Sequence, residues 1–98
     1  RFAEVVVVSM GGDGAWLVTE NEKYYAVAPP VVKKSTVGAG DSMVAGIIFM
    51  LQQQKTMKEV LAFGVACGTA ATMNEGTRLF DKDDVLKLYQ IILKHQAS

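Results

Sequence analysis

Four consecutive valines, Val5 to Val8, stand near the start of the 98-residue chain. Side chains alternate between the two faces of a strand, so a run of β-branched residues places apolar groups on both faces. Such a strand needs cover on both sides and neighbours at its edges, as in the sheet of an α/β fold. We therefore expect a buried strand here. Because a buried strand rarely opens a fold, we also expect the chain to be the C-terminal piece of a longer protein.

Strand-like segments come first along the chain. The stretch AWLVTENEKYYAVAP holds two of them around the polar ENEK, which predicts a β-hairpin that ends at Pro29-Pro30. Trp16 and the Tyr24–Tyr25 pair are then expected to pack on the sheet.

Helical patterns follow. From Asp41 to about Gln54 the sequence predicts a helix, because Met43, Val44, Ile47, Ile48 and Leu51 recur at helical spacing. Thr56 and Glu59 predict a capping box that opens a second helix, rich in small residues. Asp81 is expected to cap a third helix, whose apolar stripe contains Val85, Leu88, Tyr89 and Ile92. Strands followed by three helices predict one domain of the α/β class.

Composition excludes several classes of function. Half of the residues are hydrophobic and the formal net charge is zero, which gives no electrostatic reason to expect nucleic acid or a membrane as partner. The apolar run from Met43 to Leu51 is too short to span a bilayer. The single cysteine, Cys67, excludes an internal disulfide and fits a reduced, cytoplasmic setting.

Two glycine clusters could handle phosphate. SMGGDG leads into AWLVT, which has strand character, whereas a dinucleotide-binding fingerprint must lead into a helix. TVGAGDS lacks the lysine that a P-loop requires after its last glycine. However, a glycine turn directly before a helix presents backbone N–H groups to an anion, with the positive end of the helix dipole behind them.

Asp41 follows this turn at once. A carboxylate repels a bound anion, so its presence is useful where it takes a proton from a hydroxyl that attacks phosphorus. The alternative is that Asp41 only caps its helix, since aspartate is a good helix-start residue. From the residues alone both interpretations stay open.

The segment STVGAGDSMVAG closely resembles the C-terminal signature of the ribokinase-like (PfkB-type) carbohydrate kinases. VVVVSMGGDGAWLV resembles the family's glycine-bearing strand, and FGVACGTAATMNEGTR resembles the helix and loop that follow. The match covers nearly the whole chain and is most similar to the bacterial 6-phosphofructokinase branch. It implies that residues 1–98 are the C-terminal, nucleotide-binding segment of a kinase whose N-terminal, sugar-binding part lies outside this chain.

The resemblance also implies roles for individual residues. Asp41 would be the catalytic base, with an anion hole formed by Gly38, Ala39 and Gly40. Ser9, Gly11 and Gly14 would lie along the ribose and phosphates of ATP. The adenine pocket would be lined by Val65, Gly68 and Thr69, which share one face of a helix. A potassium ion would be bound, mostly through backbone carbonyls, at Ser35, Val37, Ala71, Asn74, Gly76 and Arg78.

The implied ligands are ATP with Mg²⁺, a sugar phosphate and potassium, and the implied assembly of the full-length enzyme is a homodimer. Fructose 6-phosphate is the expected acceptor, and fructose 1-phosphate, tagatose 6-phosphate, another sugar or a nucleoside are alternatives. A non-catalytic nucleotide-binding module is a third possibility. Each site residue also has a structural interpretation: Gly68 could serve helix packing, for example, and Asn74 and Gly76 could form a C-cap.

Overall fold

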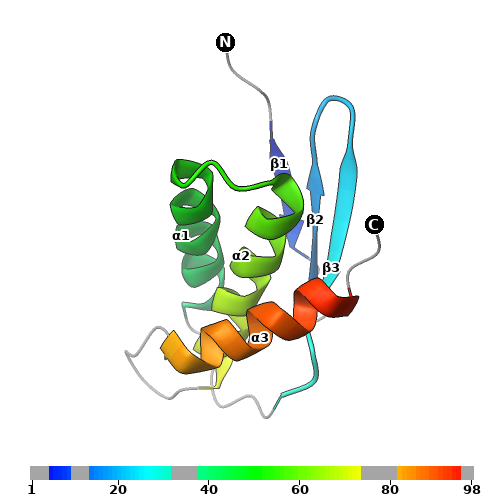
Figure 1. The fold of residues 1–98 in the computed structure, drawn as a ribbon. Coiled ribbons are helices and arrows are strands. Elements are labelled where there is room, and N and C mark those ends of the chain that lie inside the picture. Colours follow the sequence, from blue (N-terminus) through cyan, green and yellow to red (C-terminus); the bar gives the residue numbers. More distant parts are fainter. Residues whose placement is uncertain (1–4, 10–13, 32–37, 74–81, 96–98) are drawn as a thin grey trace.

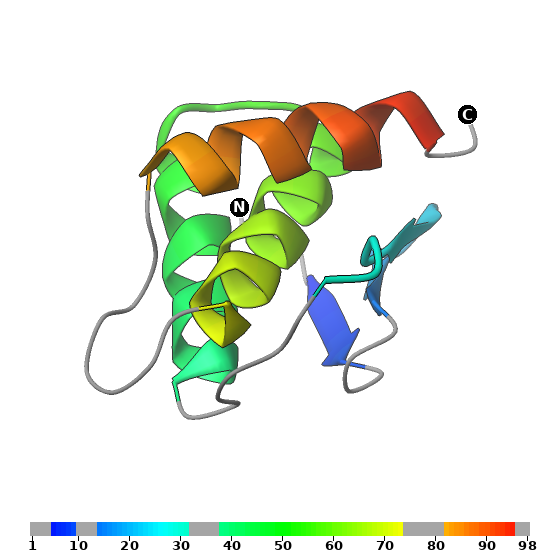
Figure 2. The same cartoon turned by 90° about the horizontal axis from the view of Figure 1, so that it is seen from below.

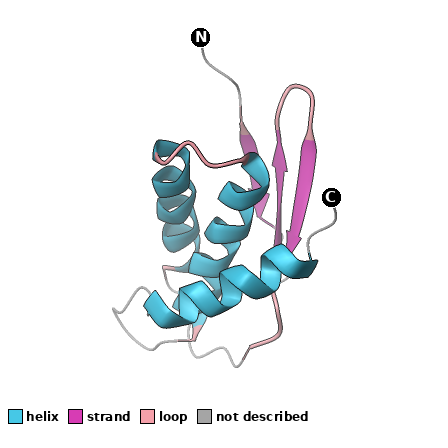
Figure 3. Cartoon of the chain, viewed as in Figure 1, coloured by secondary structure: helices cyan, strands magenta, loops and turns pink. Residues whose placement is uncertain are grey.

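The computed structural model describes residues 5–9, 14–31, 38–73 and 82–95. Three strands precede three helices (Figures 1 and 3), in the order β1 (Val6–Ser9), β2 (Gly14–Val18), β3 (Lys23–Val27), α1 (Ala39–Gln52), α2 (Met57–Thr72) and α3 (Lys82–His95). The predicted order of strands and helices is confirmed. None of these helices is long and apolar enough to cross a membrane.

The strands form an antiparallel sheet in the order β1-β2-β3. The predicted hairpin is β2–β3, in which Trp16 lies opposite Tyr25 and Leu17 opposite Tyr24. Its turn is closed by the amide of Glu22, which donates to Thr19 Oγ1 over 3.0 Å. The rings of Trp16 and Tyr25 have centroids 4.7 Å apart, so these aromatic side chains pack across the sheet as expected.

Helix α2 is the centre of the core. It packs against α1, α3, β2 and β3, and its residues Val60, Leu61, Ala62 and Ala66 are fully buried. From the sheet, Ala15, Leu17 and Ala26 meet it with no exposed surface. Helix α3 adds Val85, Leu88 and Ile92, three members of the predicted stripe, and Tyr89 packs edge-on against Phe63. The result is one helical layer on one face of the sheet (Figure 2).

The start of α2 has the predicted capping box. The Glu59 amide donates to Thr56 Oγ1 over 3.2 Å, and the Thr56 amide donates to the Glu59 carboxylate over 3.2 Å. The hydrogen bonds that the Thr56 amide and hydroxyl donate to the Glu59 carboxylate lower its pKa, because they favour its charged form. The cap predicted for α3, Asp81, lies outside the described residues.

The predicted helix is present as α1, but its buried face is not made mainly of the large apolar residues whose spacing predicted it. Its buried residues are Ser42, Gly46, Ile47 and Met50, whereas Val44 and Ile48 are 52% and 50% exposed. Leu51 is also exposed. The reason is close packing: a Cβ at Gly46 would lie 2.8 Å from Cys67 Sγ, and one at Gly64 would lie 2.6 Å from Ile47 Cγ1. The small residues, rather than the large ones, mark the surface that meets α2.

The prediction that Val5 to Val8 form a buried strand is correct for the strand and wrong for its burial. Val6 and Val8 are 51% and 46% exposed, while Val5 and Val7 are partly buried against the core. The sheet is covered by helices on one face only, so the two alternating sets of valines have different environments.

Cys67 is buried at the α1–α2 contact, and burial raises the pKa of its thiol to about 11. At pH 9 we expect iodoacetamide to alkylate it at least about 50-fold more slowly in the folded chain than in urea, because only the thiolate reacts and burial leaves about 1% of the thiol ionised. In the folded state the thiol keeps a proton that it loses in the unfolded state. The free energy of unfolding should therefore fall as the pH rises from about 9 to about 11. Equal alkylation rates in the two states would contradict this placement.

Candidate functional site

Several ends of elements meet at the lower end of the molecule in Figure 1. Strand β1 ends there at Ser9, β2 begins at Gly14, α1 begins at Ala39 and α2 ends at Thr72. A direct contact ties two of these segments together, because a Cβ at Gly68 of α2 would lie 3.2 Å from the Ala39 carbonyl oxygen. The fold thus gathers most of the described site residues at one end.

The glycine turn before α1 has the geometry of an anion site. Gly38 is the N-cap, with φ 81° and ψ −1°, a left-handed conformation that favours glycine. The first intrahelical bond runs from the Ser42 amide to the Gly38 carbonyl over 2.9 Å. The amides of Ala39, Gly40 and Asp41 therefore have no acceptor within the helix and lie at the positive end of its dipole.

The space beside Gly40 is open. A Cβ built at this residue would meet no described heavy atom within 4 Å, and its backbone is not in the left-handed region. Neither packing against the described residues nor backbone strain requires glycine here. Close approach of an external group to the backbone is a reason that remains.

Asp41 lies in the first turn of α1 and is exposed. It is the third residue of the helix and not the N-cap, so the interpretation of Asp41 as the cap residue is wrong. Within the described ranges its carboxylate has no hydrogen-bond or salt-bridge partner. A free carboxylate beside three free amides can both face an anion and accept a proton.

At two other positions, close packing explains why the residue is glycine. Gly14 has φ 139°, and a Cβ there would collide with the Ala26 carbonyl of the neighbouring strand. Gly68 lets α2 approach the first turn of α1, where its Cβ would also lie 3.3 Å from that of Met43. Their predicted contacts with ATP are therefore not needed to explain why they are glycines.

The predicted adenine-pocket residues of α2 present little surface. Val65 is 4% exposed and belongs to the core, and Thr69 is 8% exposed. The Thr69 carbonyl accepts a hydrogen bond of 2.6 Å from the Thr72 hydroxyl. Their role in binding adenine stays a prediction.

Of the predicted potassium ligands, Ala71 lies within the described residues, where it is buried in the last turn of α2. Its carbonyl accepts a hydrogen bond from a backbone N–H at the C-terminal end of the helix. Carbonyl oxygen in general suits a hard cation. In the described part of the chain no cluster of histidine, cysteine, aspartate and glutamate could hold a metal. The predicted residues outside the described ranges are Gly11, Ser35, Val37, Asn74, Gly76 and Arg78, and the side chain of Ser9 is likewise not described.

Ser42 is a polar residue that the sequence did not single out. Its side chain is 1% exposed, and its hydroxyl has no hydrogen-bond partner among the described residues. Unsatisfied buried hydroxyls are uncommon and cost about 1–3 kcal/mol. The available signal was its four-residue spacing from Gly46, which places both on the face that meets α2. We add Ser42 to the candidate site residues.

Comparison with known proteins identifies carbohydrate kinases as relatives of this chain. Residues 1–84 match the model of the pfkB family carbohydrate kinases. The ATP-dependent 6-phosphofructokinase isozyme 2 of Escherichia coli is 48% identical over 87 residues, which is 89% of this chain and 28% of that protein. The 1-phosphofructokinase of Bacillus subtilis is 42% identical over 80 residues, or 80% of this chain and 26% of that protein.

The structural match agrees. The crystal structure of phosphofructokinase-2 from E. coli in complex with potassium superposes with a TM-score of 0.86 and 46% identity, over 90% of this chain and 28% of that one. This chain spans less than a third of the length of these relatives. The fold is the ribokinase-like fold that the sequence indicated. The chain belongs to the pfkB family of carbohydrate kinases.

Proposed function

We propose that this chain carries the nucleotide side and the catalytic base of an ATP-dependent kinase that phosphorylates a hydroxyl of a sugar phosphate, with fructose 6-phosphate as the acceptor. One observation supports it most: Asp41 is exposed and unpaired within the described residues, directly behind three free amides and the open space at Gly40. Such an arrangement suits an attacking hydroxyl and a transferred phosphoryl group side by side.

In this proposal each group has one task. Asp41 accepts the proton of the attacking sugar hydroxyl as its oxygen bonds to the γ-phosphorus and the bond to the β-phosphate oxygen breaks. The amides of Ala39, Gly40 and Asp41 donate to the oxygens of the transferred group, on which negative charge must be held. The left-handed Gly38 fixes the direction of these amides by turning the chain into α1.

The ions have smaller parts. Mg²⁺ bound with ATP would neutralise phosphate charge. The Ala71 carbonyl would contribute to a potassium site. Dimerisation of the full-length enzyme and a cytoplasmic location stay predictions.

The proposal can be tested in a hybrid kinase, in which this chain replaces the matched segment of the E. coli isozyme 2. We expect ATP-dependent phosphorylation of fructose 6-phosphate within about tenfold of the parent enzyme, a difference of about 1.4 kcal/mol in activation free energy. A folded hybrid that binds ATP but has no turnover would support the alternative of a non-catalytic nucleotide-binding module.

The branch of the family to which this chain belongs is tested by a matched second host. The same replacement in the B. subtilis 1-phosphofructokinase should retain a smaller fraction of its parent's activity, if this chain belongs to the 6-phosphofructokinase branch. The comparison uses each hybrid's turnover relative to its own parent, measured with that parent's acceptor. A larger retained fraction in the 1-phosphofructokinase host would instead favour the 1-phosphofructokinase branch for this chain.

A further inference from the structure

A groove runs along β3 at the edge of the described sheet, beside the C-terminal end of α3. Its volume is about 740 Å³, within the range of about 300–1,000 Å³ that is usual for small-molecule sites. One wall consists of residues of β2 and β3 and continues into Pro29 and Pro30, and the other consists of Ile91, Ile92 and His95 of α3. No described residue assigned above to ATP or potassium lines it. The groove is therefore not part of the described candidate kinase site.

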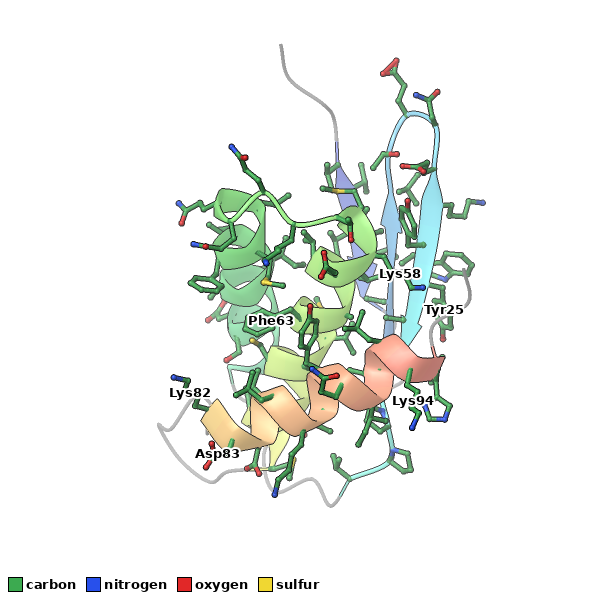
Figure 4. All side chains as sticks on the ribbon, viewed as in Figure 1. Tyr25, Lys58, Phe63, Lys82, Asp83 and Lys94 are labelled. Atoms are coloured by element: carbon green, nitrogen blue, oxygen red, sulfur yellow. The ribbon has the colours of Figure 1, made fainter. Side chains whose placement is uncertain are left out.

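The sheet wall of the groove is aromatic. Trp16 lies opposite Tyr25 in the strand register, with ring centroids 4.7 Å apart, and Figure 4 shows Tyr25 on the side of the sheet away from α1 and α2. Val27 and Ile91 add apolar surface that is 55% and 44% exposed. Aromatic rings pack favourably against one another in offset and edge-to-face arrangements. Such a wall suits a flat apolar ring.

The ionisable groups at the two ends of the groove are basic. Lys23 places its Nζ 5.8 Å from the centre of the Trp16 ring. His95 donates from Nδ1 to the Ile91 carbonyl over 3.0 Å, which leaves its Nε2 outside this bond. Among the described lining residues there is no aspartate or glutamate. The groove therefore complements a negative charge.

One carboxylate lies close by in the sequence. Glu22 precedes Lys23 in the hairpin and accepts a hydrogen bond from the Tyr24 hydroxyl, which raises the pKa of that hydroxyl. It is exposed and is not among the lining residues. A ligand in the groove thus meets the ammonium of Lys23 rather than this carboxylate.

We propose that the groove binds a small, flat, apolar anion, namely an aromatic ring system that carries one carboxylate. The ring lies against Trp16 and Tyr25, and Ile91 covers it from the side of α3. The carboxylate accepts a hydrogen bond from the ammonium of Lys23, since charge-assisted bonds of this kind are the strong ones. Protonated His95 can donate a second bond from Nε2. The proposal does not rest on the kinase function proposed above.

Two other occupants fit less well. An organic cation can bind to an aromatic wall, but the ammonium of Lys23 already lies near the Trp16 ring and would repel it. A peptide strand could pair with the free edge of β3, but Pro29 and Pro30 follow the strand closely and supply no N–H to a longer ladder. Lysine and proline at an edge strand are features that discourage such pairing.

The test titrates this chain with naphthalene carboxylate and with its neutral carboxamide, which has the same ring system. Trp16 is the only tryptophan of the chain, so a single indole N–H signal in an NMR spectrum reports on the groove. We expect the carboxylate to shift this signal in a saturable way, with a Kd at least about tenfold lower than that of the carboxamide. The readout is binding at Trp16, so it can fail while the proposed kinase function holds, and the reverse.

Lys23→Met removes the charge and keeps an apolar side chain of similar length. It should raise the Kd of the carboxylate about tenfold, to that of the carboxamide, and leave the Kd of the carboxamide unchanged. Lys87→Met is the matched control, because Lys87 is an exposed lysine of α3 that does not line the groove. It should change neither value.

A second pair of variants adds a charge instead. Val27→Asp puts a carboxylate into the groove and should weaken binding of the anionic probe at least about tenfold by repulsion. Leu86→Asp is its control, since Leu86 is 44% exposed and lies outside the groove. Val27 and Leu86 are both exposed, so both variants should fold, as circular dichroism can check.

The same titration in the hybrid kinase, with any tryptophan of the host part replaced by phenylalanine, asks whether the groove is open in a full-length protein. We expect the same order of affinities there. Four results would overturn the proposal: no saturable shift of the Trp16 signal in the chain or in the hybrid, equal Kd values for the two probes, equal effects of Lys23→Met and Lys87→Met, or a Trp16 signal that moves with protein concentration alone, as expected if a second copy fills the groove.

Discussion

The isolated chain is expected to show no turnover of fructose 6-phosphate at any ATP concentration. Asp41, the proposed base, is exposed in the first turn of α1, and none of the described residues proposed for the site is assigned to position a sugar hydroxyl against it. Correct positioning of two reactants supplies about 7–11 kcal/mol of an activation barrier. Because the matched segment is less than a third of the relatives' length, we expect the sugar contacts to come from outside it. ATP alone cannot replace them.

The assay needs a matched control, since traces of host kinase would mimic activity. We would compare the pure chain with its Asp41→Asn variant in a coupled assay over a range of ATP concentrations, with the hybrid kinase as the positive control. Equal background signals from the two chains are the expected result. A signal that depends on ATP and disappears only in the variant would show that the isolated chain positions the sugar by itself.

Local sequence signals predicted the elements well, because they act within a few residues. The Thr56–Glu59 capping box fixes where α2 begins, and its hydrogen bonds are present in the structure. The polar ENEK segment between two strand-like stretches predicted a hairpin, which is the β2–β3 pair of the structure. Each of these signals is a short-range interaction, so its outcome depends little on the rest of the fold.

Burial was predicted less well, because it depends on partners elsewhere in the chain. Helix α1 is apolar on most of its surface, so the spacing of Val44 and Ile48 could not show which side meets α2. The contacts at Gly46 and Gly64 determine that side, and small residues carry no hydrophobic signal. Likewise the valines of β1 indicated a strand with two apolar faces, but not which face the described helices cover.

Some features of the candidate site could likewise be predicted from the sequence, and others could not. The turn at Gly38 and the place of Asp41 in the first helical turn follow from the sequence, apart from the cap, which is Gly38 rather than Asp41. The resemblance assigned Gly68 to the adenine pocket, whereas the structure supplies a packing reason at the Ala39 carbonyl. Ser42 was missed because one hydroxyl in an apolar helix looks ordinary until its burial is known.

In the hybrid kinase, Asp41→Asn is expected to lower turnover by about 10²–10⁴-fold, the range typical of a lost general base. Asparagine keeps the shape of the side chain and removes its charge and its capacity to take a proton. Since Asp41 stands at the third helical position rather than at the cap, its contribution to α1 is an interaction with the helix dipole, about 0.3–1 kcal/mol. The melting temperature should therefore fall only slightly, and ATP affinity should hold.

The most direct test of the central claim is the turnover of fructose 6-phosphate by the hybrid kinase and its Asp41→Asn variant at saturating ATP, with a melting curve for each. If Asp41 is the base, the variant melts within a few degrees of the hybrid and its turnover falls by at least about 100-fold. If Asp41 only stabilises the start of α1, turnover stays near that of the hybrid, and the assignment of Asp41 as the catalytic base is wrong.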